Sequence, residues 1–208
     1  MAVASLPRPV ESAPGRPSLP PGDWPAQGEW TYEDYLRLPD IPGRRYEILF
    51  GVLHMADTPD LAHQMVVSRL DRRIGTLVED GDLGDLLVAP VEVRLGPAAD
   101  PVPPDVLFIR AERRDIIKTQ CVDGPPDLVV EVLSPGTMRT DRITKLNAYE
   151  QAGVPEYWIV DPKGRTVEVY TLDGGEYALL GQYAVGEEIH SSVLAELALP
   201  VAALFPGT

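Results

Sequence analysis

Apolar residues recur along the chain in two periods, one typical of strands and one typical of helices. From about residue 45 onward these two kinds of stretch follow one another. The predicted strands are two short ones within Arg45–Met55 that meet near Gly51, then Leu86–Leu95, Val106–Ile109, Leu128–Leu133, Tyr157–Val160 and Thr166–Thr171. The predicted helices are a short one that begins at a capping box over Thr31–Asp34, then Pro59–Glu79, Glu112–Thr119 and Thr137–Ala152.

The last third of the chain is predicted to be rich in strands. A hairpin is expected between Tyr157–Val160 and Thr166–Thr171, and further short strands around Asp173–Gly175 and Gly186. A final apolar segment covers Val193–Leu204. This order predicts an α/β (α+β) fold, in which a mixed central β-sheet is flanked by helices and followed by a strand-rich C-terminal third.

Length and composition suit one globular domain. The chain has 208 residues, 44% of them hydrophobic, and the domain is expected over residues 29–208. Seven prolines precede residue 26 in a segment with few aliphatic residues, so residues 1–28 are expected to form a disordered or loosely attached tail. Cys121 is the single cysteine, and neither a signal peptide nor a membrane-length apolar run is recognisable. These features indicate a cytoplasmic protein without a membrane partner.

The charge balance argues against tight, non-specific binding to nucleic acid. The formal net charge is −14, whereas proteins that grip a phosphate backbone usually present a basic surface. Basic residues gather only locally, which is typical of solvated helix faces. These groups are Arg69, Arg72 and Arg73; Arg110, Arg113, Arg114 and Lys118; and Arg139, Arg142 and Lys145.

Three acidic residues stand inside or beside apolar runs, where an ionised side chain is costly. Glu131 interrupts Leu128–Leu133, Asp105 directly precedes Val106–Ile109, and Glu47 precedes another apolar triplet. If the two longer runs form neighbouring strands, Asp105 and Glu131 converge at one place. Carboxylates held together repel each other, and a divalent cation relieves that repulsion. The oxygen ligands suit Mg²⁺ or Mn²⁺.

Lys145 is the candidate cationic partner of these acids. On the predicted helix it lies one turn from Asp141 and can reach over the end of the neighbouring strand. Near a bound metal ion it would orient or help to deprotonate a water, or neutralise charge on a pentavalent phosphate. A single helix lysine is more often solvent-exposed, so this role depends on its conjunction with the acids. His63, at the start of its helix, is left open between contact with the site and a capping or packing role.

Several segments in the same order resemble a known family. Pro104-Asp105 before one strand and Glu131 within the next are similar to the PD-(D/E)XK nuclease superfamily. More narrowly, the chain resembles the Uma-type restriction endonuclease family over roughly residues 44–171. The segments that carry this resemblance are RYEILFGVLHMAD, PPDVLFI, PDLVVEVLSPGTMRTDRITKLNAYEQAGVPEYWIVDP and VEVY, together with His63.

The resemblance implies a restriction-endonuclease-like fold and a set of site residues. Asp105 and Glu131 would be metal ligands, the Val132 carbonyl a third, and Glu47 an auxiliary acid. The superfamily's lysine would fall at Leu133, where it is absent, and the Uma-type pattern places it instead where this chain has Lys145.

The leading hypothesis is therefore an Mg²⁺- or Mn²⁺-dependent endonuclease that hydrolyses DNA with an activated water. Its catalytic residues would be Glu47, Asp105, Glu131 and Lys145. One alternative is a catalytically inactive nuclease fold that serves as a binding or assembly module, which the net charge of −14 favours. A weaker alternative is a hydrolase of RNA or small nucleotides. A homodimer is expected for an enzyme that cuts both strands.

Overall fold

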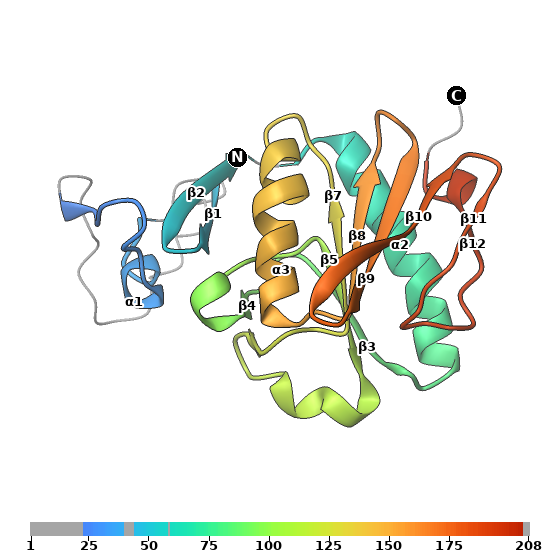
Figure 1. Cartoon of the computed structure of the whole chain (residues 1–208), viewed down its shortest axis with the longest axis horizontal. Coiled ribbons are helices and arrows are strands. Elements are labelled where there is room, and N and C mark those ends of the chain that lie inside the picture. The colour runs from blue at the N-terminus through green and yellow to red at the C-terminus, as the bar shows by residue number, and fades with distance from the viewer. Residues whose placement is uncertain (1–22, 40–43, 58, 206–208) are drawn as a thin grey trace, which may run out of the picture.

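A computed structural model describes residues 23–39, 44–57 and 59–205. Its centre is a six-stranded sheet in the order β10-β9-β8-β7-β5-β3 (Figure 1). The strands are β3 (Gly84–Val88), β5 (Val106–Arg110), β7 (Leu128–Val132), β8 (Glu156–Asp161), β9 (Thr166–Asp173) and β10 (Glu176–Ala184). Neighbouring strands are antiparallel except β7 and β8, which are parallel. Parallel neighbours need a crossover connection, and the chain between these two strands contains a helix.

Two helices cover opposite faces of this sheet (Figure 1). Helix α2 (Leu61–Asp80) begins at the N-cap Asp60, whose carboxylate accepts the N–H of His63. The second helix begins with a π-helical stretch, Thr140–Lys145, and continues as α3 (Leu146–Ala152). It ends at Gly153, whose φ of 80° is the left-handed conformation that glycine adopts without a Cβ penalty.

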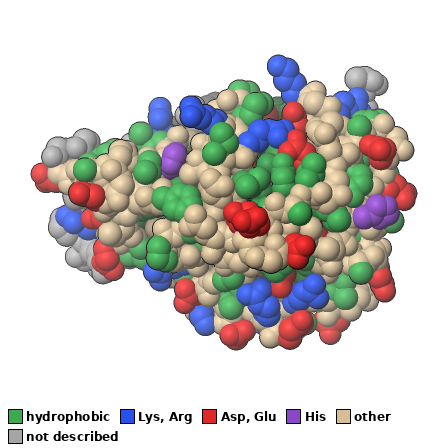
Figure 2. Space-filling model, in the orientation of Figure 1, with side chains coloured by type: hydrophobic (Ala, Val, Ile, Leu, Met, Phe, Trp, Pro, Cys, Tyr) green, Lys and Arg blue, Asp and Glu red, His purple; other side chains and the backbone are tan. Residues whose placement is uncertain are grey.

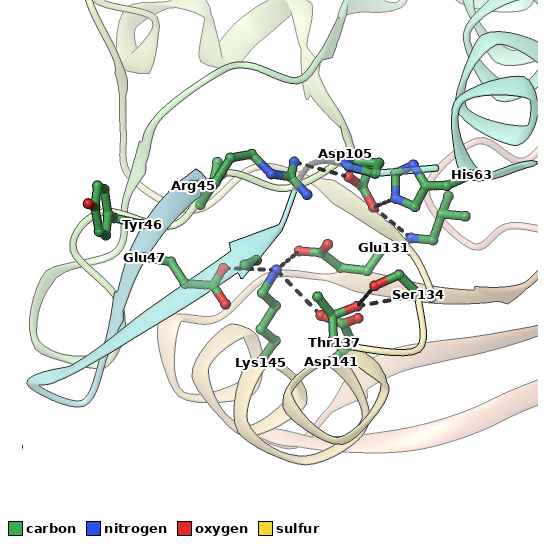
Figure 3. Close-up of a pocket in the computed structure, with 14 residues that line it drawn as sticks. Arg45, Tyr46, Glu47, His63, Asp105, Glu131, Ser134, Thr137, Asp141 and Lys145 are labelled. Atoms are coloured by element: carbon green, nitrogen blue, oxygen red, sulfur yellow. Dashed lines mark hydrogen bonds and ion pairs between the residues drawn. The ribbon is translucent and has the colours of Figure 1, made fainter. Parts of the chain in front are cut away.

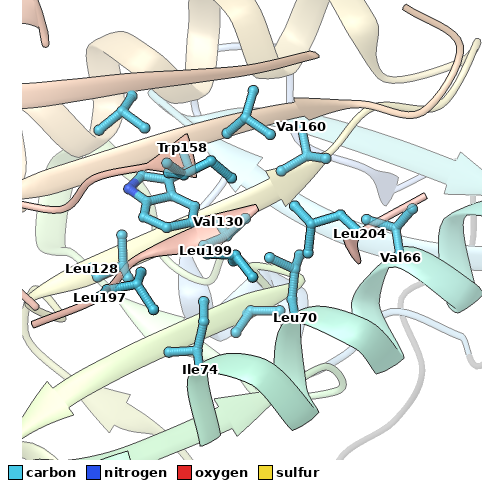
Figure 4. Close-up of a cluster of buried hydrophobic side chains, with 14 of the residues drawn as sticks. Val66, Leu70, Ile74, Leu128, Val130, Trp158, Val160, Leu197, Leu199 and Leu204 are labelled. Atoms are coloured by element: carbon cyan, nitrogen blue, oxygen red, sulfur yellow. The ribbon is translucent and has the colours of Figure 1, made fainter. Parts of the chain in front are cut away.

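The face under α2 is an apolar core (Figure 4). Even-numbered residues of β5, β7 and β8, such as Val130 and Trp158, point toward this face, as do Val167 and Val169 of β9, and they share a core with Leu70 and Ile74 of the helix. The C-terminal segment also closes over this face with Leu197, Leu199 and Leu204, among others.

The opposite face packs against α3 and is not wholly apolar. Odd-numbered strand residues such as Val129 and Ile159 meet Ala148 and Tyr149 of the helix. Glu131 shares this face by strand alternation, as the sequence predicts, and it lies at the end of β7. The acidic residue is therefore buried between sheet and helix, with an exposed fraction of 3%.

A separate two-stranded hairpin lies beside the end of the sheet. It is formed by β1 (Arg44–Leu49) and β2 (Val52–Asp57), with the short helix α1 (Tyr32–Tyr35) packed nearby. The capping box predicted at Thr31 and Asp34 is present in full. Backbone hydrogen bonds join the hairpin to the loop that leads toward Asp105: the Ile48 N–H donates to the Pro101 carbonyl at 3.0 Å. This junction brings β1 against the site described below.

The remaining elements are short. Strands β4 (Val93–Arg94) and β6 (Val122–Asp123) pair in parallel, and β11 (Glu188–Ile189) pairs with β12 (Leu199–Pro200). Single 3₁₀ turns occupy Gly96–Ala98 and Val201–Ala203, and a longer one occupies Ala111–Ile116.

The predicted fold class is confirmed: a mixed sheet is flanked by helices, and the strand-rich C-terminal third supplies β8, β9 and β10 of that sheet. The hairpin of Tyr157–Val160 with Thr166–Thr171 is also confirmed, as β8 and β9. Within the described residues, no helix has the length and apolar character needed to cross a membrane. The tail expected over residues 1–28 lies outside the described residues as far as residue 22.

Two predicted elements are wrong in detail. The strand expected over Leu86–Leu95 is divided into β3 and β4, because Pro90 cannot donate a hydrogen bond to a sheet. The helix expected over Glu112–Thr119 is the 3₁₀ turn described above, and it contains a non-helical kink at Arg113. The short strands predicted around Asp173–Gly175 and Gly186 are present: β9 and β10 flank the first turn, and β10 and β11 flank the second.

Candidate active site

Asp105 and Glu131 meet at one end of the sheet. Strands β5 and β7 are antiparallel neighbours, with Val106 opposite Val130, so the start of β5 lies beside the end of β7. Both acids line a small pocket at that end (Figure 3). The convergence predicted from the sequence therefore exists in the structure, while the chemical roles of the two residues stay predictions.

Lys145 reaches the acids and is buried among them (Figure 3). Its Nζ lies 3.0 Å from Oε1 of Glu131 and 3.1 Å from Oε2 of Glu47. A third carboxylate oxygen, Oδ1 of Asp141, lies 3.4 Å away. The exposed fraction of Lys145 is 4%, so it is not a solvated helix lysine.

The helix that carries Lys145 is π-helical at this point, over Thr140–Lys145. Such stretches are uncommon and occur frequently at functional sites. Asp141 and Lys145, four residues apart, are both buried on the side facing the strand ends. One turn further along, the Tyr149 hydroxyl donates to Oε1 of Glu131 at 2.7 Å. The helix thus supplies an acid, a cation and a hydroxyl to one pocket.

Asp105 is held by donors from two other elements. His63 on α2 places Nε2 at 2.9 Å from Oδ2, and the Val132 backbone N–H donates to the same oxygen at 2.8 Å. The guanidinium of Arg45 on β1 lies further away, with Nη1 at 3.8 Å from Oδ1. His63 therefore does contact the site, and Val132 contributes its N–H. Metal binding by the Val132 carbonyl stays a prediction.

Glu47 enters the pocket from the hairpin and is buried there. The sequence indicated an auxiliary acid at this position but not its partner, which the structure identifies as Lys145. Three further residues of the pocket or its wall, Arg45, Asp141 and Tyr149, were not predicted as site residues. Helical spacing at intervals of four around Lys145 was an available signal for Asp141 and Tyr149, whereas no local signal pointed to Arg45.

Burial and mutual repulsion shift the pKa values of these acids. Burial, with repulsion from Asp105, Asp141 and Glu47, raises the pKa of Glu131 well above its ordinary value, although Lys145 acts in the opposite direction. Burial likewise raises the pKa of Asp141. Burial also opposes ionisation of Asp105, but the hydrogen bond and charge of His63, aided by Lys145 and the Val132 N–H, lower its pKa.

Lys145 keeps its proton. Burial alone would lower its pKa, but the carboxylates of Glu131, Glu47 and Asp141 outweigh that effect and raise the pKa well above its ordinary value. The ammonium group therefore acts as a fixed positive charge at neutral pH. It can donate hydrogen bonds but is not a base.

The donor chemistry of the pocket fits a hard divalent cation. Four buried carboxylates, those of Glu47, Asp105, Glu131 and Asp141, outnumber the cationic groups that reach into it. Lys145 and Tyr149 both donate to Oε1 of Glu131, which leaves Oε2 outside these two bonds. Within the described part of the chain, however, no three His, Cys, Asp or Glu side chains are grouped so as to hold a metal. Two side-chain ligands completed by water and substrate are a common arrangement for Mg²⁺.

The pocket is small as it stands. Its volume is about 20 Å³, a little more than one water molecule needs, which is roughly 10–15 Å³. Ser134 and Thr137 close its lower side and hydrogen-bond to each other at 3.0 Å.

The face of the molecule seen in Figure 2 is mixed in charge rather than basic. On the face seen in Figure 2, Lys and Arg side chains lie in small groups near the upper and lower margins, with Asp and Glu beside them. Arg142 is engaged by Glu168, with Nη1 at 2.7 Å and 2.9 Å from its two oxygens. Arg139 is exposed. On this face, positive charge is therefore present only in small local groups and does not form a continuous basic surface.

Comparison with known proteins places the chain in a family. It matches the family described as "Uma2: Putative restriction endonuclease" over residues 32–202. The chain belongs to this family. The match contains every candidate site residue, and the description of the family supports a nuclease function.

A solved structure shares the fold of this Uma2 member. It is described as "a putative nuclease belonging to DUF820 from Anabaena variabilis", with a TM-score of 0.69 and 20% sequence identity. The similarity covers 84% of this chain and 96% of the other. At this identity the likeness establishes the fold. No curated protein matches the chain.

Proposed function

We propose that this protein is a metal-dependent endonuclease that hydrolyses phosphodiester bonds of DNA. The observation that carries the proposal is the position of Lys145, whose ammonium group lies within 3.4 Å of three buried carboxylates at the sheet end where Asp105 also lies. A buried lysine with a purely structural role needs only one carboxylate to balance its charge, whereas Lys145 has three. An excess of buried carboxylates is costly for folding, and it is typical of sites that bind a cation and a charged substrate.

Asp105 and Glu131 would hold Mg²⁺ or Mn²⁺, through oxygens that their hydrogen-bond donors leave available. When bound, the metal ion would lower the pKa of a water and offset charge on the phosphate. His63 and the Val132 N–H fix the orientation of the Asp105 carboxylate, and Tyr149 does the same for Glu131.

Lys145 would orient the attacking water or neutralise negative charge on the phosphate in the transition state. Its raised pKa supports these two roles rather than removal of a proton. Glu47 keeps the ammonium group in place from the hairpin side. Asp141 is suited to accept the proton of the water, because burial raises its pKa and its Oδ1, which is ion-paired with Lys145 Nζ at 3.4 Å, accepts no hydrogen bond among the described residues.

The test is cleavage of supercoiled plasmid DNA by the full-length protein with Mg²⁺ or Mn²⁺. Glu131→Gln and Lys145→Met should each lower the rate by at least about 100-fold, since each removes a group that contacts the reacting centre. Glu112→Gln and Lys118→Met change exposed residues of the same types and should leave the rate unchanged. If the wild type and all four variants behave alike, the nuclease proposal fails.

A second candidate is a non-catalytic nuclease fold that acts as a binding or assembly module. The small pocket, in which the ammonium group of Lys145 occupies the centre of the carboxylates, favours it, as does the net charge of −14. Calorimetric titration with Mn²⁺, combined with turnover assays on DNA, RNA and nucleotides, separates the candidates. The module predicts metal binding without turnover of DNA, RNA or nucleotides, whereas the enzyme predicts both together.

A further inference from the structure

Arg45 presents unused hydrogen-bonding capacity beside the acidic pocket. It lies on the same face of β1 as Glu47 and points toward Asp105 (Figure 3). The 3.8 Å between Nη1 and Oδ1 of Asp105 exceeds the roughly 2.7–3.2 Å of a hydrogen bond. The Nε of Arg45 is buried and has no hydrogen-bond partner among the described residues. Because a buried donor without an acceptor is unfavourable, this group is suited to a ligand.

A second and much larger cavity adjoins the pocket at Arg45. It has a volume of about 520 Å³, within the roughly 300–1,000 Å³ of small-ligand sites. Arg45, Tyr46 and Pro103 line both cavities, so the two are adjacent and share these residues as a wall. The cavity is also lined by Tyr35, Pro90, Val91 and Gln120. Flat apolar surfaces with an amide at the edge suit a planar heterocycle.

The acid in this second cavity is already engaged. Glu92 accepts hydrogen bonds from the Tyr35 hydroxyl at 2.7 Å and the Tyr32 hydroxyl at 3.4 Å. These donors disperse the charge of the carboxylate and lessen its repulsion of an anion. Arg45, by contrast, lines both this cavity and the acidic pocket. The distribution of charge therefore favours a ligand with its apolar part near Tyr35 and its anionic part near Arg45.

We propose that this cavity receives the nucleotide next to the scissile phosphate, with its base against Tyr35 and its phosphate bound by Arg45. This inference rests on the proposed nuclease function and specifies how the substrate strand lies. The guanidinium fork matches two phosphate oxygens, which a single ammonium cannot do. A base can enter such a cavity only when it is not stacked in a duplex. The favoured substrate is therefore single-stranded or locally opened DNA.

The experiment measures binding of a short fluorescein-labelled single-stranded DNA to the full-length protein by anisotropy, in EDTA so that no cleavage occurs. Arg45→Met should weaken binding by about tenfold or more and lower the slope of log K against log salt by about one. Arg45→Lys, which keeps the charge but not the fork, should fall between wild type and Arg45→Met. Tyr35→Leu should weaken binding of the single strand more than binding of a duplex of the same sequence.

Arg72→Met is the matched control. Arg72 lies exposed on α2 and lines a different surface cavity with Arg69 and Arg73, away from the acidic pocket. Circular dichroism of every variant verifies folding. If Arg45→Met binds like wild type, or if Arg72→Met is equally impaired, the inference is overturned while plasmid cleavage by the wild type still supports the nuclease function. A wild type that neither binds nor cuts nucleic acid would overturn both.

Discussion

Two buried glutamates on neighbouring strands have very different surroundings. Glu131 ends β7 on the α3 face, and Glu156 begins β8 at the opposite end on the α2 face. Their exposed fractions are 3% and 0%, so burial alone does not distinguish them. The neighbours do: Glu131 faces three other carboxylates and one lysine, whereas Glu156 faces neutral donors.

The donors around Glu156 satisfy both of its oxygens. Oε1 accepts from Trp158 Nε1 at 2.8 Å and from the Ser191 hydroxyl at 2.6 Å. Oε2 accepts from the backbone and hydroxyl of Ser192 and from the Val193 N–H. This carboxylate fastens the C-terminal segment to the sheet. A buried acid that is fully hydrogen-bonded serves the fold, and one held against like charges is a candidate for chemistry.

The largest expected difference between Glu156 and Glu131 concerns the free energy of unfolding. Glu156→Ala leaves several buried donors without an acceptor, so it should lower the free energy of unfolding by about 3–5 kcal/mol. Cleavage per folded molecule should stay near the wild-type rate. Urea unfolding followed by fluorescence measures the first quantity, with the exposed Glu176→Ala as control. A stable Glu156→Ala variant would contradict the structural role assigned to this carboxylate.

Asp105 combines features of Glu131 and Glu156. Substitution of His63, which hydrogen-bonds to Asp105, tests which of the two it resembles more closely. Its Oδ2 is hydrogen-bonded like an oxygen of Glu156, while it lies among the carboxylates around Glu131. His63→Phe removes one donor to Asp105. It should raise the Mg²⁺ concentration needed for half-maximal cleavage by about 10–100-fold. His63→Gln, which keeps a donor, should be milder. Equal and small effects of the two variants on the Mg²⁺ titration would mean that His63 only packs.

The smallest expected effect is on the pH dependence of stability without metal. Because the folded state raises the pKa of Glu131, this group favours folding most below its unfolded pKa of about 4.5. That contribution is lost as pH rises through the folded value. Glu131→Gln should remove this loss, so its stability relative to wild type should increase with pH, on the order of 1–2 kcal/mol. Urea unfolding in EDTA across acidic to neutral pH tests the sign, and a variant that instead loses stability at higher pH contradicts it.

The sequence located the principal acids because their local setting is unusual. A carboxylate inside Leu128–Leu133 or directly before Val106–Ile109 is visible in any strand pattern, and the spacing to Lys145 follows from the helix. Glu156 gave no such signal, since it follows Pro155 at the very start of its strand. Its burial depends on the segment from Ser191 to Val193, which lies about 35 residues further along the chain.

By itself, therefore, the sequence determined the order of the elements, the face of β7 on which Glu131 lies, and the position of a candidate lysine on the following helix, whose contact with Glu131 the structure then established. These features follow from backbone periodicity, which is a local property. Only the tertiary structure decided that the hairpin docks on the loop before Asp105, and so brings Glu47 to Lys145 and Arg45 to the edge of the pocket. The docking depends on hydrogen bonds such as that from Ile48 to Pro101, which join residues distant in sequence and leave no periodic trace.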